Sequence, residues 1–155
     1  LLWANVDLEA RTFHLPEDVV ENHNGITLPM SSVLHRLLSE RRDLAKPSDK
    51  VAKRRRAERP SKYVFPSWGA TGHMTDAKAT MEAGSEVAGT WVTVHDLRRG
   101  YVDVCAQVGV SANVERMLVN HISGDVHDRH YANSKLAMAE AAEKVAQWIT
   151  GAALV

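Results

Sequence analysis

The segment between Thr93 and Gly109 constrains the fold most, because it carries the start, the stop and the periodicity of one helix. Thr93 is followed three residues later by Asp96, which is the spacing of a capping box at a helix N-terminus. Apolar side chains then recur on one helical face, at Leu97, Tyr101, Val104, Cys105 and Val108. Gly109 stands where glycine is favoured, just past a last helical turn. We therefore predict an amphipathic helix that ends at about Gln107.

Similar periodicity predicts further helices on both sides of this segment. Apolar residues at spacings of three and four predict a helix over about 31–42 and a C-terminal helix over about 135–150. Ser111 opens another short helix. Thr75 is a candidate cap for a helix over about 76–83, which the glycines that follow would break. The core-facing residues expected in the first and last of these helices are Val33, Leu34, Leu37, Leu38, Met138, Ala142, Val145 and Ile149.

The N-terminal part of the chain has the pattern of a small sheet. Residues 11–16 and 26–29 alternate between polar and apolar side chains, and residues 21–25 between them are rich in Asn and end in Gly. Alternation on both sides of such a turn predicts a strand, a turn and an antiparallel strand. We expect an α+β protein, mainly α-helical, with this sheet near its N-terminus. A length of 155 residues suits one domain over 1–155 better than two.

Positive charge is concentrated in one stretch, residues 41–62. The whole chain has 19 Lys and Arg against 19 Asp and Glu, so its net charge does not itself favour nucleic acid as a partner. Residues 41–62 hold ten of those bases and only three acids. Two interpretations stay open: a solvated loop, or a loop that contacts DNA phosphates. The candidate DNA contacts in it are Lys53, Arg54, Arg55 and Arg56.

Cysteine content and hydropathy limit the compartment. The only cysteine, Cys105, excludes a disulfide within the chain and fits a reducing compartment such as the cytoplasm. No apolar run reaches the length that spans a bilayer, so we expect no membrane partner. Residues 1–5 lack the basic leader of a signal peptide, and the first residue is Leu1 rather than Met. We expect the chain to begin inside a longer protein.

Four residues could carry chemistry. His95 and Arg98 lie three apart on a predicted helix, so both side chains project from one face. Alone, this spacing is more often a surface histidine beside a solvated arginine. His121 follows 23 residues after Arg98, and Tyr131 follows ten residues later in a polar stretch that is unusual for a core tyrosine. The ordered set is therefore more informative than any member of it.

Taken in order, these residues resemble the tyrosine recombinase family, which includes the phage integrases. Residues 94–99 read VHDLRR and are similar to the family's H-x-x-R motif. Residues 117–121 read MLVNH and resemble its Leu-x-x-His motif, and Tyr131 follows at the spacing of its nucleophile. Further resemblance lies in LWANVDL at 2–8, in the hairpin and helix start over 22–31, and in YVFP at 63–66. The resemblance covers nearly the whole chain except the basic stretch.

The resemblance implies the family's catalytic-domain fold and site-specific recombination or integration of double-stranded DNA. Tyr131 would attack a DNA phosphate, form a 3′-phosphotyrosine and release a 5′-hydroxyl. His95 would be the candidate base, while Arg98 and His121 would bind the phosphate and Arg99 would contact DNA nearby. The family needs no metal or other cofactor. Its members act as tetramers on paired DNA sites, here in a bacterial or phage-infected cytoplasm.

Two features depart from the family pattern. The family has a first catalytic arginine just before the segment in which this chain begins, so the chain alone is expected to be inactive or nearly so. The family also has a hairpin lysine eight residues before the hairpin proline, and the same count back from Pro29 reaches Glu21. A carboxylate there repels a phosphate. A shifted register, replacement by Lys46 or Lys53, and impaired catalysis all remain open.

Other interpretations follow from the same residues. A prophage-derived protein that binds DNA without cutting it is the alternative that Glu21 favours. A zinc site could use His121, His127 and His130, although their spacing matches no zinc motif and no cysteine pair accompanies them. The C-terminal helix could pack on its own domain or dock on a neighbouring protomer, since its alanine-rich face permits close packing in either case.

Overall fold

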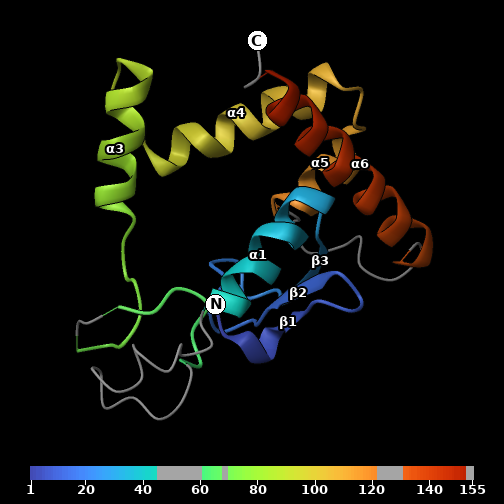
Figure 1. Cartoon of the computed structure of the whole chain (residues 1–155). Helices are drawn as coiled ribbons and strands as arrows, with labels where there is room; N and C mark the ends of the chain where they lie inside the picture. The colour runs from blue at the N-terminus through green and yellow to red at the C-terminus, as the bar shows by residue number, and fades with distance from the viewer. Residues whose placement is uncertain (45–60, 68–69, 122–130, 153–155) are drawn as a thin grey trace. The chain divides into compact units, whose positions relative to one another are not determined.

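The computed structural model describes residues 1–44, 61–67, 70–121 and 131–152 (Figure 1). In these residues the protein is α+β and mainly helical, with a small antiparallel sheet, as predicted. The chain divides into two compact units, Leu1–Met74 and Thr75–Val155. In the described ranges, no helix combines the length and apolar character needed to cross a membrane.

The first unit is built on a three-stranded antiparallel sheet. Its strands, in spatial order, are β1 (Val6–Asp7), β2 (Thr12–Leu15) and β3 (Ile26–Pro29). The register pairs Val6 with Phe13 and Phe13 with Leu28. Because side chains at paired positions share a face, these three apolar residues line the side of the sheet that faces the core. His14 and Thr27, which pair with each other, lie on the opposite face.

Helix α1 (Ser32–Leu44) follows the sheet directly and covers its apolar face. The Ser31 hydroxyl accepts a hydrogen bond from the Leu34 N–H at 3.2 Å, which caps the helix. Leu38 is buried, but Leu37 is 52% exposed, so its predicted place in the core is wrong. The buried cluster of this unit consists of Val6, Met30, Leu38 and Val64.

Residues 61–66 close the first unit beside the N-terminus. The Trp3 N–H donates to the Lys62 carbonyl at 3.0 Å, and the Val64 N–H donates to the Leu1 carbonyl at 3.1 Å. The short 3₁₀ helix η1 (Trp3–Asn5) follows this pairing. The Arg41 Nε of α1 donates to the Val64 carbonyl. Backbone and side-chain bonds thus tie together three segments that are far apart in sequence.

The second unit is helical where it is described. Its elements are α3 (Lys78–Ala88), α4 (Val94–Gln107), α5 (Ala112–Leu118) and α6 (Tyr131–Ala152). Helix α6 packs against α4 and α5 (Figure 1). The core of the second unit consists of Val104 and Cys105 of α4 and Val145 of α6, surrounded by partly buried Tyr101, Val108 and Val110.

Helix α3 differs from the prediction at both ends. It begins at Lys78, where the Asp76 carboxylate rather than Thr75 accepts the Lys78 N–H at 2.8 Å. It also continues through Gly84 and ends before Gly89, whose φ is 65°. A glycine inside a helix costs roughly 1 kcal/mol relative to alanine, which weakens a helix without ending it. The Ser85 hydroxyl supports this stretch, because it accepts the Val92 N–H at 2.8 Å.

Helix α6 is longer than the predicted 135–150. It runs over Tyr131–Ala152, and its buried positions are Ser134, Met138, Ala141 and Val145. Spacings of four, three and four place these side chains on one stripe. Ile149 is 46% exposed, so its predicted core position is wrong. The stripe packs on helices of its own chain, which is the first of the two arrangements expected from the sequence.

Candidate active site

The N-terminus of α4 is fixed by the predicted capping box. The Thr93 Oγ1 accepts from the Asp96 N–H at 3.2 Å, and the Asp96 Oδ2 accepts from the Thr93 N–H at 3.0 Å. The Thr93 hydroxyl also donates to Asp96 Oδ2 at 2.6 Å. This hydroxyl bond, with the backbone bond and smaller contributions from Arg99 and His95, lowers the pKa of Asp96. The box defines the first turn of α4, which carries His95.

His95 and Arg98 lie on consecutive turns of α4, and both are exposed. Residues three apart on a helix share a face, so the imidazole and the guanidinium project to the same side. Arg99 is also exposed, close enough to Asp96 for their charges to interact. The predicted grouping of His95 and Arg98 is therefore present in local geometry.

The Arg98 side chain reaches from α4 to the carboxyl end of α5. Its Nη2 donates to the carbonyl of Val119, the residue that ends α5, at 2.7 Å. The last carbonyls of a helix have no intrahelical partner and carry partial negative charge, which attracts a guanidinium. A guanidinium has five N–H donors, so this bond leaves others for an anion. Arg98 is thus held in place while most of its donors stay available.

The residues after Val119 form a tight turn that leads to His121. Asn120 has a φ of 50°, in the left-handed region, and its N–H donates to the Met117 carbonyl at 3.0 Å. The His121 N–H donates to the Arg116 carbonyl at 2.8 Å. These two bonds form a Schellman motif, a frequent helix ending. His121 is therefore two residues after Val119, whose carbonyl binds Arg98. The His121 side chain is exposed.

Tyr131 is the first residue of α6, and its side chain lies outside the part that the structure describes. Because α6 packs against α4 and α5, the Tyr131 backbone belongs to the same compact unit as the other three residues. The structure thus brings Arg98 and the His121 segment together and places His95 one turn from Arg98. The position of the Tyr131 hydroxyl remains a prediction.

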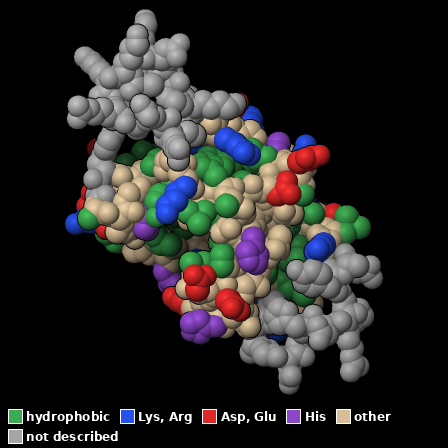
Figure 2. Space-filling view, turned by 90° about the horizontal axis from the view of Figure 1, so that it is seen from below, with side chains coloured by type: hydrophobic (Ala, Val, Ile, Leu, Met, Phe, Trp, Pro, Cys, Tyr) green, Lys and Arg blue, Asp and Glu red, His purple; other side chains and the backbone are tan. Residues whose placement is uncertain are grey.

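The predicted DNA contacts Lys53, Arg54, Arg55 and Arg56 lie outside the described residues, as do His127 and His130 of the zinc alternative. Figure 2 shows Lys and Arg side chains interspersed with Asp and Glu over the described surface on the face it presents. This distribution agrees with the balanced charge of the chain. Because residues 53–56 lie outside the described residues, the predicted DNA contacts of the basic stretch stay predictions.

Glu21 lies in the connection between β2 and β3. This connection contains two turns, closed by bonds from the Val19 N–H to the Pro16 carbonyl and from the His23 N–H to the Val20 carbonyl, both 3.1 Å. Glu21 lies inside the second turn and is exposed. Its carboxylate therefore points to solvent from the hairpin in which the resemblance implies a lysine.

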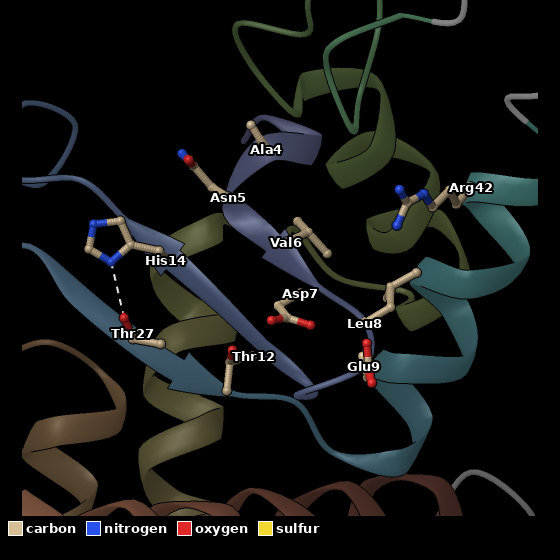
Figure 3. Close-up of a pocket in the computed structure, with 10 residues that line it drawn as sticks. All are labelled: Ala4, Asn5, Val6, Asp7, Leu8, Glu9, Thr12, His14, Thr27 and Arg42. Carbon is tan, nitrogen blue, oxygen red and sulfur yellow. Dashed lines mark hydrogen bonds between the residues drawn. The ribbon is translucent and has the colours of Figure 1, made fainter.

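The first unit has an open recess lined by residues of η1, of all three strands and of α1 (Figure 3). Its volume is about 760 Å³, and it is lined by Ala4, Asn5, Val6, Asp7, Leu8, Glu9, Thr12, His14, Thr27 and Arg42. His14 Nδ1 and Thr27 Oγ1 lie 3.1 Å apart at one side, and Arg42 enters from α1 at the other. Two carboxylates against one guanidinium do not favour phosphate, and we assign no function to this recess.

Sequence reasoning missed two residues of the candidate site, Val119 and Asn120. Asn120 had a usable signal, because asparagine is one of the few residues besides glycine that end helices in the left-handed conformation. The contribution of Val119 is a backbone carbonyl, which residue type does not reveal.

Comparison with known proteins adds no family assignment. No protein-family model, no curated protein and no solved structure matches the chain.

Proposed function

We propose that the protein is a tyrosine recombinase that cleaves and rejoins double-stranded DNA through a 3′-phosphotyrosine at Tyr131, in a catalytic domain of that family's fold. The observation that carries the proposal is the 2.7 Å bond from Arg98 Nη2 to the Val119 carbonyl. It joins the H-x-x-R helix to the end of the helix that precedes His121. These are the two motifs that the family uses to bind one phosphate.

The chemistry follows from these groups. The Tyr131 oxygen attacks the phosphorus, the phenolic proton passes to His95, and the bond from phosphorus to the 5′-oxygen breaks. The departing 5′-oxygen takes up a proton from solvent water and leaves as a hydroxyl, while the exposed His95 returns its proton to solvent. Attack of a 5′-hydroxyl on the phosphotyrosine reverses each step and rejoins the strand, so the exchange requires no nucleotide hydrolysis.

Arg98 and His121 stabilise the charge that develops on the phosphate. A guanidinium presents a planar pair of donors that matches two phosphate oxygens. The carboxyl end of α5 would by itself repel an anion, and the Arg98 charge offsets that repulsion at the same place. The exposed imidazole of His121 adds a hydrogen bond to a non-bridging oxygen. Such positioned donors are worth most where charge grows in the transition state.

The proposed partner is double-stranded DNA, bound by Arg99 and by the basic stretch that contains Lys53, Arg54, Arg55 and Arg56. The proposed assembly is a homotetramer on paired sites, in the cytoplasm of a bacterial or phage-infected cell. The reaction would be integration or excision of a mobile DNA element.

The test is covalent capture of DNA by the full natural protein. The probe is a randomised-sequence pool of nicked duplexes, labelled so that the label stays with the protein after attack. We expect a protein–DNA adduct that resists detergent and disappears in Tyr131→Phe. Tyr101→Phe, a matched change on α4, keeps the adduct. An adduct that survives Tyr131→Phe refutes the assignment of the nucleophile, and no adduct with any variant refutes cleavage.

A second candidate function, DNA binding without cleavage, is favoured by the exposed carboxylate of Glu21 in the β2–β3 connection. It predicts retarded migration of the same duplex pool in a gel together with no covalent adduct. The two functions therefore differ in one measurement on the same samples.

A further inference from the structure

The end of α5 uses a residue type that differs from the ends of α3 and α4. Left-handed residues follow all three helices: Gly89 after α3, with φ 65°, Gly109 after α4, with φ 74°, and Asn120 after α5, with φ 50°. Only glycine adopts this region without a steric cost from its side chain. A non-glycine residue there is held by its surroundings and marks a position of interest.

The three helix ends share one backbone pattern. At each end, the left-handed residue donates to the carbonyl three positions back, and the next residue donates to the carbonyl five positions back, with distances between 2.8 and 3.3 Å. The three ends differ in the contacts made by the groups just before and just after the left-handed residue. Past α5, the carbonyl just before the turn accepts Arg98, and the residue just after it is His121.

We propose that Asn120 is a positioning residue for the phosphate site, which rests on the function proposed above. Its left-handed backbone turns the chain out of the helix, so that the Val119 carbonyl stays available to Arg98. The same turn places His121 at the edge where the guanidinium lies. One backbone conformation thus positions both phosphate-binding side chains.

The alternative conformation shows why this position matters. If residue 120 took a right-handed helical conformation, α5 would continue, and the Val119 carbonyl would accept the N–H four residues further on. Arg98 would then share this acceptor with a helical N–H. His121 would lie on the continued helix, about 100° around the axis from residue 120, and not at the turn beside Val119.

The test compares three variants in single-turnover adduct formation at saturating nicked duplex. Asn120→Ala favours the right-handed conformation, and we expect a rate on the order of 10²-fold lower, as for a catalytic group displaced by about 1 Å. Asn120→Gly keeps the left-handed turn and cleaves near the wild-type rate. The control Gly89→Ala adds similar backbone strain after α3, where a Cβ meets no atom within 4 Å, and it also cleaves near the wild-type rate.

Three results would overturn the inference: wild-type cleavage by Asn120→Ala, failure of Asn120→Gly to restore the rate, or an equal loss in Gly89→Ala. A second readout does not depend on cleavage. The NMR resonances of the Arg98 guanidinium should move towards those of a solvated arginine in Asn120→Ala and stay unchanged in Gly89→Ala. If the wild-type protein forms no adduct, the proposed function fails, and the Arg98 resonances still decide the part played by Asn120.

Discussion

At the scale of single residues, Arg98 has one observed partner, the Val119 carbonyl, and one proposed partner, a DNA phosphate, and the two require different things of its side chain. The Val119 carbonyl needs one N–H, which a lysine could also supply, whereas a phosphate clamp needs the planar fork. The two requirements can be separated by a substitution that keeps the charge.

Arg98→Lys is therefore expected to lower the rate of adduct formation on the order of 10²-fold, as for loss of one positioned donor to the transition state. The melting temperature should change little, because the residue is exposed. The matched control is Arg116→Lys on α5, also exposed, which should leave the rate unchanged. An Arg98→Lys enzyme of wild-type rate would exclude the bidentate role.

Glu21 allows a gain-of-function test at the same scale. If Glu21 stands where the resemblance implies a lysine, replacing its carboxylate with a cation removes a repulsion and adds a phosphate donor, and Glu21→Lys is expected to raise the adduct rate on the order of 10²-fold. Glu17→Lys, an exposed residue of the same connection, controls for the added charge. Equal rates in the two variants would mean that Glu21 does not occupy the position of the family's lysine.

At the scale of elements, local signals predicted local structure well. The capping box at Thr93 and the glycine after Val108 gave both ends of α4, because each signal acts through hydrogen bonds within one turn. Gly84 led to a wrong prediction for the end of α3. The free-energy cost of one glycine inside an exposed helix is smaller than the stabilisation that the rest of the helix provides. No N-cap residue in the sequence indicated the first turn of α6, so the predicted helix began too late. The buried side chains from Ser134 onwards show which face of α6 packs on its unit.

The capping box gives a stability prediction with a defined pH dependence. Thr93→Ala is expected to lower the free energy of unfolding by about 1 kcal/mol near neutral pH. The two Thr93 bonds to the Asp96 carboxylate hold its pKa below its ordinary 3.8, so this part of the cap is present above that pH and lost as the pH falls through the folded-state pKa. The bond from the Asp96 N–H to Thr93 Oγ1 does not depend on the carboxylate, so urea unfolding should show the gap to wild type narrowing in acid. Thr80→Ala, on exposed α3, should show no such trend.

Tyr101 predicts a second pH dependence, at the alkaline end. Burial raises the pKa of Tyr101 from 10.0 to about 12, so the folded state favours the neutral phenol. This contribution is complete below pH 10 and is lost as the pH rises through 12. The free energy of unfolding should therefore decline across this window in wild type and in Tyr63→Phe. It should decline less in Tyr101→Phe, and parallel curves for all three would refute the burial argument.

At the scale of the whole molecule, what the sequence could predict depended on separation along the chain. His95 and Arg98 were paired because they are one helical turn apart. The contact between Arg98 and Val119 spans 21 residues and depends on how α4, α5 and α6 pack, which no local pattern encodes. For the same reason, counting from Pro29 located Glu21 in its hairpin and gave no information about its distance from Arg98.

The chain has a net charge of zero but a basic stretch at residues 41–62, so the contribution of this stretch to DNA affinity can be tested separately from the total charge. If residues 41–62 bind DNA phosphates, replacing four of their bases with alanine should reduce the steepness of the salt dependence of affinity by roughly 0.9 for each phosphate that is no longer neutralised. The four are Lys53, Arg54, Arg55 and Arg56. The control removes the same charge from exposed positions elsewhere, at Arg11, Arg36, Lys78 and Lys144. Fluorescence anisotropy of a labelled duplex over a salt series gives both slopes. If the slope falls by the same amount in the two variants, the attraction depends on total charge, and the basic stretch has no special role in binding DNA.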